Sequence, residues 1–232
     1  MTDHYYIKTI HLFINQCQRE LIINSRQLRN LIFSAIFFCM IIVFFPLTIV
    51  PNIKILRSLA PGLIWISMLL TIIAAADRLF QHDYEHGVVE QWLASGMPVS
   101  IIVVAKICMH WLLTLIPILI MCLFVSVLFS LSVYEEFIIV ISLILGTPTL
   151  VFVCALASAS CNGSQQNSAL LPLILLPLVV PVMIFGSGTV IAVMNNLAVA
   201  GYLAILSALS LLSITFLPIA IATIIKISFV LD

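Results

Sequence analysis

The fold is decided by the stretch Asp77-Arg78-Leu79-Phe80-Gln81-His82-Asp83-Tyr84-Glu85-His86-Gly87-Val88-Val89-Glu90-Gln91-Trp92-Leu93. It holds four of the nine acidic residues of the chain, one arginine and two of the five histidines. A charged side chain costs roughly 2.5–3.5 kcal/mol at the centre of a hydrocarbon layer. We therefore expect this stretch in water or at a membrane surface, with the apolar segments around it arranged to keep it there.

The composition places the rest of the chain in lipid. Of the 232 residues, 63% are hydrophobic and only 8% are charged, whereas a soluble domain carries about 25% charged residues. The formal net charge is zero, which gives no case for nucleic-acid binding. The length allows one membrane domain over residues 1–232, without a sizeable soluble one. The first thirty residues hold six charges and no early apolar core, so no cleavable signal peptide is expected.

Six segments are apolar for long enough to cross a bilayer, which takes about 20 residues of helix. The chain is thus predicted to be an all-α integral membrane protein with spans at 31–50, 58–76, 100–131, 137–160, 168–192 and 198–225. Residues 77–99 form the loop between the second and third spans. Residues 1–30 are expected to hold an amphipathic interfacial helix, with a solvent-exposed helix docked on a partner as the alternative. One face of that helix would carry Tyr6, Ile10, Phe13, Ile14, Cys17 and Leu21.

Lysine and arginine predict the orientation of the chain. Six spans put both termini on one side, and that side carries seven lysines and arginines against two on the other. Loops rich in these residues stay in the cytoplasm. We therefore expect a multi-pass protein whose termini and residues 77–99 are cytoplasmic.

Gly87 divides the charged stretch into two short segments. Glycine permits a bend at this point, and apolar residues gather at both ends of the stretch with acid between them. We expect a bent surface element whose apolar side chains face lipid or neighbouring helices and whose carboxylates face a cytoplasmic partner. The sequence shows no phosphate-binding loop, so a soluble ATPase would be the source of energy for transport.

Metal binding is an alternative role for the charged stretch. His82 and His86 are spaced i, i+4 and would face the same way on a helix, where Asp83 or Glu85 could complete a site. A solvated helical face is the better interpretation, because a wet, charged loop supplies such pairs easily. The six cysteines show no CxxC pair and are interpreted as small apolar side chains. We predict no metal site.

Some residues inside the predicted spans are candidates for a transport pathway or for helix kinks. His110 lies inside an apolar segment, where an ionisable group suggests function and could ligate a metal or haem. A neutral histidine near the interface, bonded to a backbone carbonyl, is the simpler interpretation. Gly146, Thr147 and Pro148 weaken one span, and Pro177 and Pro181 weaken another. Ordinary kinked packing explains these residues about as well. Because no enzyme motif is present, we predict no catalytic residue.

Separate blocks along nearly the whole chain resemble the CcmB family, the haem exporter proteins B of cytochrome c maturation. One departure is the turn at 162–167, which is uncharged here but often basic in the family. The blocks are Asp77-Arg78-Leu79-Phe80-x-x-Asp83-x-x-x-Gly87-x-x-Glu90-Gln91, Ala60-Pro61-Gly62-Leu63-Ile64-Trp65, Ala105-Lys106-x-x-x-His110-Trp111, Leu145-Gly146-Thr147-Pro148-Thr149-Leu150, Leu176-Pro177-Leu178-x-x-Pro181-Val182-x-Ile184-Phe185-Gly186 and Gly201-Tyr202-Leu203-Ala204.

The resemblance implies an ABC-2-type permease of the cell inner membrane that works as a homodimer. It implies docking on the ATPase subunit CcmA, which hydrolyses ATP, and work with CcmC, CcmD and, indirectly, the haem chaperone CcmE. Haem is implied as a transported substrate, and we predict no cofactor held by this chain. The resemblance gives the loop after the second span the role of a coupling helix, with Asp77, Arg78, Phe80, Asp83, Gly87, Glu90 and Gln91 as its coupling residues.

Three functions stay open at this point. The first couples ATP hydrolysis to haem export or to release of a haem-loaded chaperone. The second is a non-transporting scaffold that links the ATPase to a haem-handling subunit, because the sequence shows no clear pair of axial haem ligands and no cationic lining for the haem propionates. The third is an ABC-2 exporter of another small molecule or lipid, which rests on fold analogy alone.

Overall fold

The computed structural model describes residues 12–22, 28–48, 52–76, 79–94, 96, 98–161 and 171–231. Within these residues every regular element is a helix. A helix over residues 12–22, here called the N-terminal helix, comes first. It is followed by α2 (Leu28–Thr48), α3 (Ile53–Ala76), α4 (Gln81–Glu85), α5 (Val88–Ala94), α6 (Val99–Leu128), α7 (Val133–Cys161), α8 (Leu171–Met194) and α9 (Ala200–Leu231).

Helix length and composition fit a membrane protein. Five described helices, α3, α6, α7, α8 and α9, are long and apolar enough to cross a bilayer. Helix α2 has 21 residues, which at 1.5 Å per residue gives about 30 Å, the thickness of a hydrocarbon core. Its apolar part is Ile32–Thr48. The prediction of an all-helical, multi-span membrane protein is confirmed.

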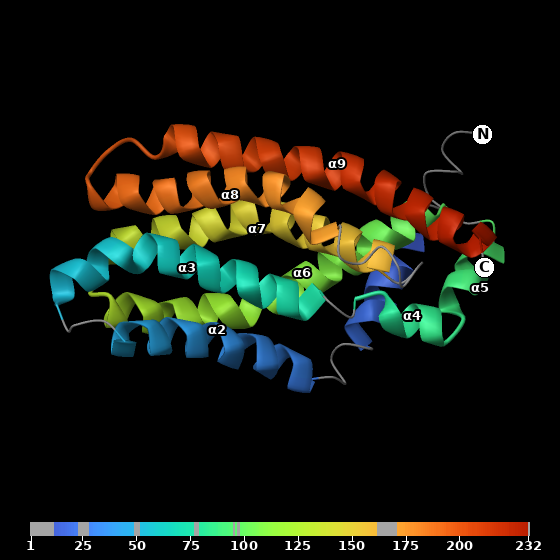
Figure 1. Cartoon of the computed structure of the whole chain (residues 1–232), viewed down its shortest axis with the longest axis horizontal. Helices are drawn as coiled ribbons and strands as arrows, with labels where there is room; N and C mark the ends of the chain where they lie inside the picture. The colour runs from blue at the N-terminus through green and yellow to red at the C-terminus, as the bar shows by residue number, and fades with distance from the viewer. Residues whose placement is uncertain are drawn as a thin grey trace.

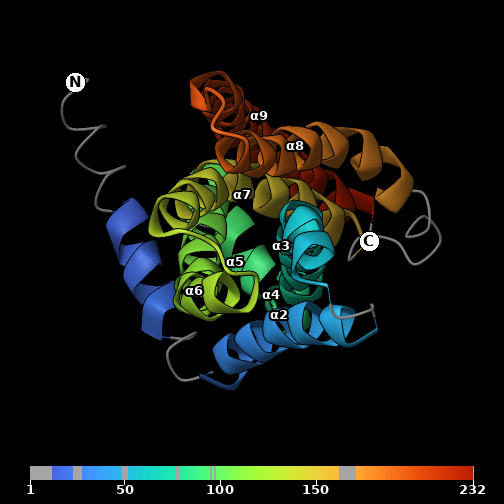
Figure 2. The ribbon, with the colours of Figure 1, turned by 90° about the vertical axis from the view of Figure 1, so that its left-hand side faces the viewer.

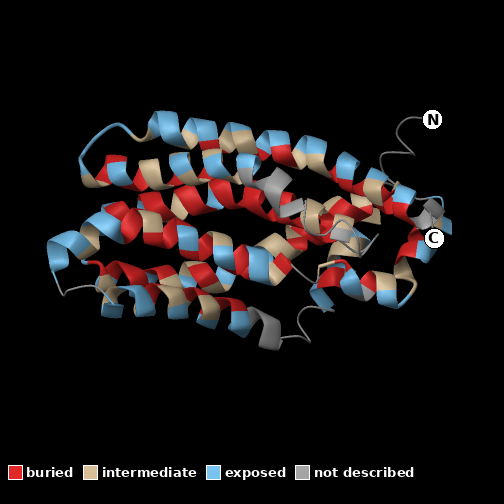
Figure 3. Cartoon of the chain, in the orientation of Figure 1, coloured by how far each residue is buried: buried red, intermediate tan, exposed pale blue. Residues whose placement is uncertain are grey.

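The six long helices run along the long axis of the molecule (Figure 1). Seen from one end, α8 and α9 lie on one side, α2 lies on the opposite side, and α3, α6 and α7 lie between them (Figure 2). Helix α7 is the most buried of the five candidate spans and α9 the least, a difference that Figure 3 shows along both ribbons. Helices α4 and α5 share one end of the bundle with the C-terminal end of α9 (Figure 1).

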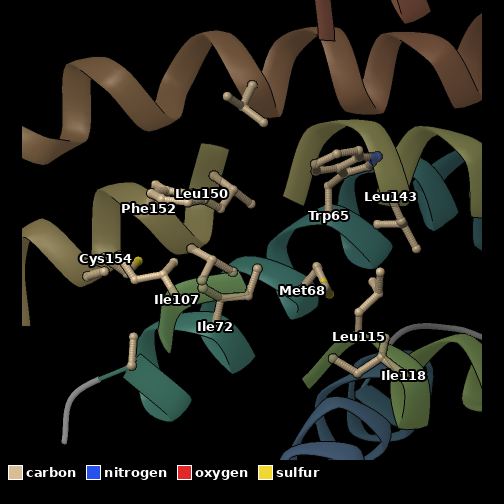
Figure 4. Close-up of a cluster of buried hydrophobic side chains, with 14 of the residues drawn as sticks. Trp65, Met68, Ile72, Ile107, Leu115, Ile118, Leu143, Leu150, Phe152 and Cys154 are labelled. Atoms are coloured by element: carbon tan, nitrogen blue, oxygen red, sulfur yellow. The ribbon is translucent and has the colours of Figure 1, made fainter. Parts of the chain in front are cut away.

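A single tryptophan of α3, Trp65, packs against both α7 and α8. Trp65 is completely buried, and Figure 4 shows it within the core formed by α3, α6 and α7. A Cβ atom added to Gly146 of α7 would lie 2.6 Å from Trp65 Cη2, and one added to Gly186 of α8 would lie 2.3 Å from Trp65 Cε2. Because carbon atoms normally pack at about 3.5–4.0 Å, the two glycines form a notch that any side chain would fill.

Helix α3 begins at Ile53 rather than at residue 58 because a polar residue supports its first turn. The side-chain oxygen of Asn52 accepts a hydrogen bond from the backbone nitrogen of Lys54 at 3.0 Å. This is the arrangement of an N-cap, which satisfies one of the free N–H groups at a helix start. Lys54 and Arg57, which precede the predicted span at 58–76, therefore belong to the helix itself.

An ion pair joins the start of α3 to the turn between α6 and α7. Arg57 Nη2 lies 2.6 Å from Glu135 Oε1, and Arg57 Nη1 donates to the carbonyl of Ser130 at 2.8 Å. Glu135 Oε2 accepts from the backbone nitrogen of Ser132 at 2.7 Å, and the Ser132 hydroxyl accepts from the backbone nitrogen of Glu135 at 3.3 Å. This reciprocal pair is a capping box, so Arg57 is bound to a rigid helix start.

Arg57→Ala is expected to lower the free energy of unfolding by about 1 kcal/mol, because buried Glu135 loses its cation. Thermal unfolding in detergent measures the effect. Lys54→Ala is the matched control, since this lysine is exposed on the same turn, and it is expected to change stability by less than about 0.5 kcal/mol. Equal unfolding temperatures for the two variants would contradict a structural role for the ion pair.

Candidate functional site

The charged stretch folds into two short helices that meet at Gly87, and we call residues 80–94, which contain α4, Gly87 and α5, the elbow. Gly87 has φ +66°, a left-handed conformation that costs other residues about 1–2 kcal/mol. Its backbone nitrogen donates to the carbonyl of Tyr84 at 3.2 Å, and its carbonyl accepts from Gln91 at 3.4 Å. Gly87 therefore ends α4 and starts α5.

The elbow has one buried face and one exposed face. Phe80, Val89 and Trp92 are buried against the bundle. The exposed face carries carboxylates and polar side chains, contributed by Gln81, Glu85, His86, Glu90 and Gln91. The exposed face therefore presents two carboxylates, two amides and one imidazole on the side away from the membrane helices.

Asp83 is an exception to the expected arrangement, because its carboxylate is buried rather than turned outward. Its Oδ2 atom lies 2.7 Å from Lys106 Nζ in α6. Lys106 Nζ also lies 3.4 Å from Oε2 of Glu20 in the N-terminal helix, and Glu20 Oε1 accepts from Gln16 at 3.2 Å. We call Glu20, Asp83 and Lys106 the Lys106 cluster.

Part of the predicted coupling set falls outside the described residues. These residues are Asp77 and Arg78. The side chain of His82, which belongs to the histidine pair considered as a metal site, also lies outside the described residues. Among the described residues, three or more histidine, cysteine, aspartate or glutamate side chains do not gather into a metal-binding group.

The predicted pathway residues are distributed over three helices. Thr147 of α7 accepts a hydrogen bond from Trp111 Nε1 at 2.9 Å and donates to the carbonyl of Leu143 at 2.6 Å. In α6, His110 Nε2 is buried without a hydrogen-bond partner among the described residues. Pro148 is buried in α7, directly after Gly146 and Thr147. These side chains pack between helices.

Helix α8 contains Pro177 and Pro181 but remains one continuous helix from Leu171 to Met194. The side chain of Pro177 is exposed and that of Pro181 is half-buried. Helix α8 packs mainly on α3, α7 and α9 rather than on α6, which carries His110, and it is not a broken helix within its described backbone.

The cavities on the described part of the chain include two of similar size. One of about 430 Å³ lies between the N-terminal helix, α6 and α9, and one of about 420 Å³ lies between α2, α3 and the end of α6. Neither is lined by a predicted coupling or pathway residue. The first is lined by Phe13, Ser100, Ile101, Val104, Ile214, Thr215, Pro218 and Ile219.

Comparison with known proteins decides the family. The sequence profile of the CcmB protein family matches residues 11–228. The chain belongs to the CcmB family. Relatives named Heme exporter protein B include that of Haemophilus influenzae, 36% identical over 217 residues covering 94% of this chain and 98% of the relative. The Pseudomonas aeruginosa relative is 35% identical over 210 residues, covering 90% and 94%, and the Escherichia coli K12 relative is 38% identical over 192 residues, covering 83% and 87%.

The sequence reasoning gave no role to two members of the Lys106 cluster in this CcmB-family chain. Lys106 stood only within a sequence block shared with the family, and Glu20 was not singled out. One signal was available, because a lysine inside an apolar run needs a counter-ion. The acidic stretch that precedes α6 in the sequence is the obvious source of such a partner.

Proposed function

We propose that this chain is the permease subunit of an ABC transporter for cytochrome c maturation. It couples ATP hydrolysis by a partner ATPase, CcmA, to export of haem or to release of a haem-loaded chaperone. Support comes from the relatives named Heme exporter protein B and from the exposed acidic face of the elbow. The chain supplies no catalytic residue, and ATP binds the partner subunit.

The assembly proposed here follows the family. Two copies of this chain form the membrane part of the complex in the cell inner membrane, with CcmC and CcmD beside them and CcmE receiving haem. The positive-inside count supports a cytoplasmic location for the elbow and both termini. On that orientation, the Arg57–Glu135 pair lies at the outer face.

The elbow is connected to the membrane helices in two ways. Along the chain, the backbone nitrogen of Leu79 donates to the carbonyl of Ala76 at 3.0 Å, so the end of α3 continues closely toward α4. Across the structure, the buried ion pair of Asp83 joins α4 to Lys106 of α6. A force that a partner applies to the exposed face of the elbow is therefore transmitted to both α3 and α6, the second and third spans.

The double variant Glu85→Gln and Glu90→Gln tests the docking role of the exposed face. We expect about tenfold less ATPase subunit to co-purify, because each exposed ion pair contributes up to about 1 kcal/mol and 1.4 kcal/mol is a factor of ten. Maturation of c-type cytochromes should fall in parallel while the amount of the permease in the membrane stays constant. Lys226→Gln, an exposed charge near the C-terminal end of α9, is the control.

Unchanged recovery of the ATPase in the double variant would contradict docking at these carboxylates. Normal maturation together with normal recovery would reject the coupling function of the elbow as a whole.

A scaffold that does not carry haem is the second candidate function. It is favoured by the packed centre of the subunit, where Trp65 fills the notch between α7 and α8. In this case the conformational change that ATP hydrolysis drives is transmitted laterally, through this subunit, to a haem-handling subunit. Haem bound to the purified permease alone, and lost on His110→Ala, would favour transport through this chain. Absence of haem from the purified permease would favour the scaffold.

A further inference from the structure

The Lys106 cluster is unlike an ordinary surface ion pair because all three side chains are nearly inaccessible. The exposed fraction is 10% for Lys106, 3% for Glu20 and 6% for Asp83. Removing charges from water has a large desolvation cost, and a well-packed apolar triplet is often as stable as a buried ion pair. Stability alone is therefore a poor explanation for three charges at this position.

The cluster joins three elements that have separate places in the chain. Glu20 comes from the N-terminal helix and is 86 residues from Lys106. Asp83 comes from the elbow, and Lys106 lies in the second turn of α6. Lys106 is thus the point at which the N-terminal helix, the elbow and a membrane span are held together.

The two ion pairs of Lys106 are unequal. The ammonium lies 2.7 Å from the Asp83 carboxylate and 3.4 Å from the Glu20 carboxylate. The shorter contact, to Asp83, is an ion pair without hydrogen-bond geometry, since Asp83 Oδ2 has no hydrogen-bond partner among the described residues, whereas the longer contact, to Glu20, is a hydrogen bond. A small displacement of α4 away from α6 would lengthen the first contact and leave the ammonium free to close on Glu20.

We propose that Lys106 is a positioning residue whose ammonium group exchanges its closer partner between Asp83 and Glu20. Movement of the elbow then also moves the N-terminal helix. This rests on the proposed function, because it assumes that a partner moves the elbow. The N-terminal helix then takes part in coupling, through a switch between two carboxylates that share one cation. Such a switch has two discrete arrangements, as a coupling element requires.

The alkylation rate of Cys17 is a measure of movement of the N-terminal helix. It lies on the same helix as Glu20 and is half-buried. Burial raises the pKa of its thiol above the ordinary value, and the neighbouring Glu20 carboxylate adds to the rise. Because the thiolate is the reactive form, movement that frees Cys17 from these surroundings accelerates its alkylation by a maleimide.

The test measures maleimide alkylation of Cys17 in the full complex, with and without a non-hydrolysable ATP analogue. The other five cysteines are replaced by alanine. In this background we expect the nucleotide to change the alkylation rate on the order of 5-fold or more, the range of common allosteric couplings. Asp83→Asn should abolish the nucleotide response while the N-terminal helix stays docked through Glu20. Lys106→Met should abolish it as well, and Lys106→Arg should restore it.

Glu20→Gln is the control for misfolding of the elbow, because it leaves the Asp83–Lys106 ion pair intact. It should also remove the nucleotide response. A response that persists in Asp83→Asn and Glu20→Gln would overturn the switch. If these variants lose maturation but keep a normal Cys17 response, the inference fails while the proposed function stands. If the Glu85 and Glu90 double variant binds the ATPase and matures cytochromes normally, the proposed function itself fails.

Discussion

Gly186→Ala is expected to destabilise the subunit severely, because the notch that holds Trp65 closes. The added Cβ would lie 2.3 Å from Cε2 and 2.4 Å from Cζ2 of the indole. Trp65 has little room to retreat, since the backbone of Gly146 in α7 borders the same ring so closely that a Cβ added there would lie only 2.6 Å from Cη2. Overpacking of a well-filled core typically costs 1–3 kcal/mol, and we expect about 3 kcal/mol here because two rigid groups collide. Thermal unfolding of the purified subunit in detergent measures the loss.

Two glycines of the same chain serve as controls for this result. A Cβ added to Gly62 in α3 or to Gly201 in α9 would meet nothing within 4 Å. Alanine is favoured over glycine inside a helix by about 1 kcal/mol, so Gly62→Ala and Gly201→Ala should leave stability unchanged or raise it. Trp65→Phe in the Gly186→Ala background should recover part of the loss. Wild-type stability of Gly186→Ala would contradict the notch.

Gly87→Val is expected to uncouple the permease without removing it from the membrane. A β-branched residue is strongly disfavoured at φ +66°, and even an ordinary residue pays about 1–2 kcal/mol in that region. Since 1.4 kcal/mol is a factor of ten, the bent elbow should become about tenfold less populated. Both ATPase stimulation and cytochrome maturation should fall accordingly.

Gly87→Asn is the matched control, because asparagine tolerates the left-handed conformation better than other non-glycine residues. It should keep most of the activity that Gly87→Val loses. The level of each variant in the membrane is measured by quantitative immunoblotting, and coupling by nucleotide hydrolysis in the purified complex. Full activity of Gly87→Val would show that the elbow does not need this bend.

The fold was largely predictable because lipid is a simple solvent. Long apolar runs must become helices there, so the spans follow from hydropathy. Their ends were less predictable, since α3 begins at Ile53 only because Asn52 caps it. Arg57 can lie in its first turns because Glu135, far along the chain, neutralises it. The sequence alone does not reveal this ion pair, because its two residues are 78 positions apart.

The candidate site was predictable in outline but not in the direction of its side chains. The sequence indicated an acidic element with a bend at Gly87, and that element exists. It did not indicate that Asp83 turns inward, because this depends on where Lys106 lies after α6 has packed. The notch for Trp65 was hidden for the same reason. Gly146 and Gly186 belong to different helices, and no sequence pattern links them to a tryptophan in a third.

Site-specific photo-crosslinking in cells tests the coupling role of the elbow most directly. A photoreactive amino acid is placed at Glu90 on the exposed face of the elbow, and in a second strain at Tyr134, which is exposed at the start of α7. Crosslinks to the ATPase subunit are expected from position 90 and not from position 134. Crosslinking from position 134 alone, or no crosslink at position 90 in cells where the complex assembles, would contradict the proposed coupling role of α4 and α5.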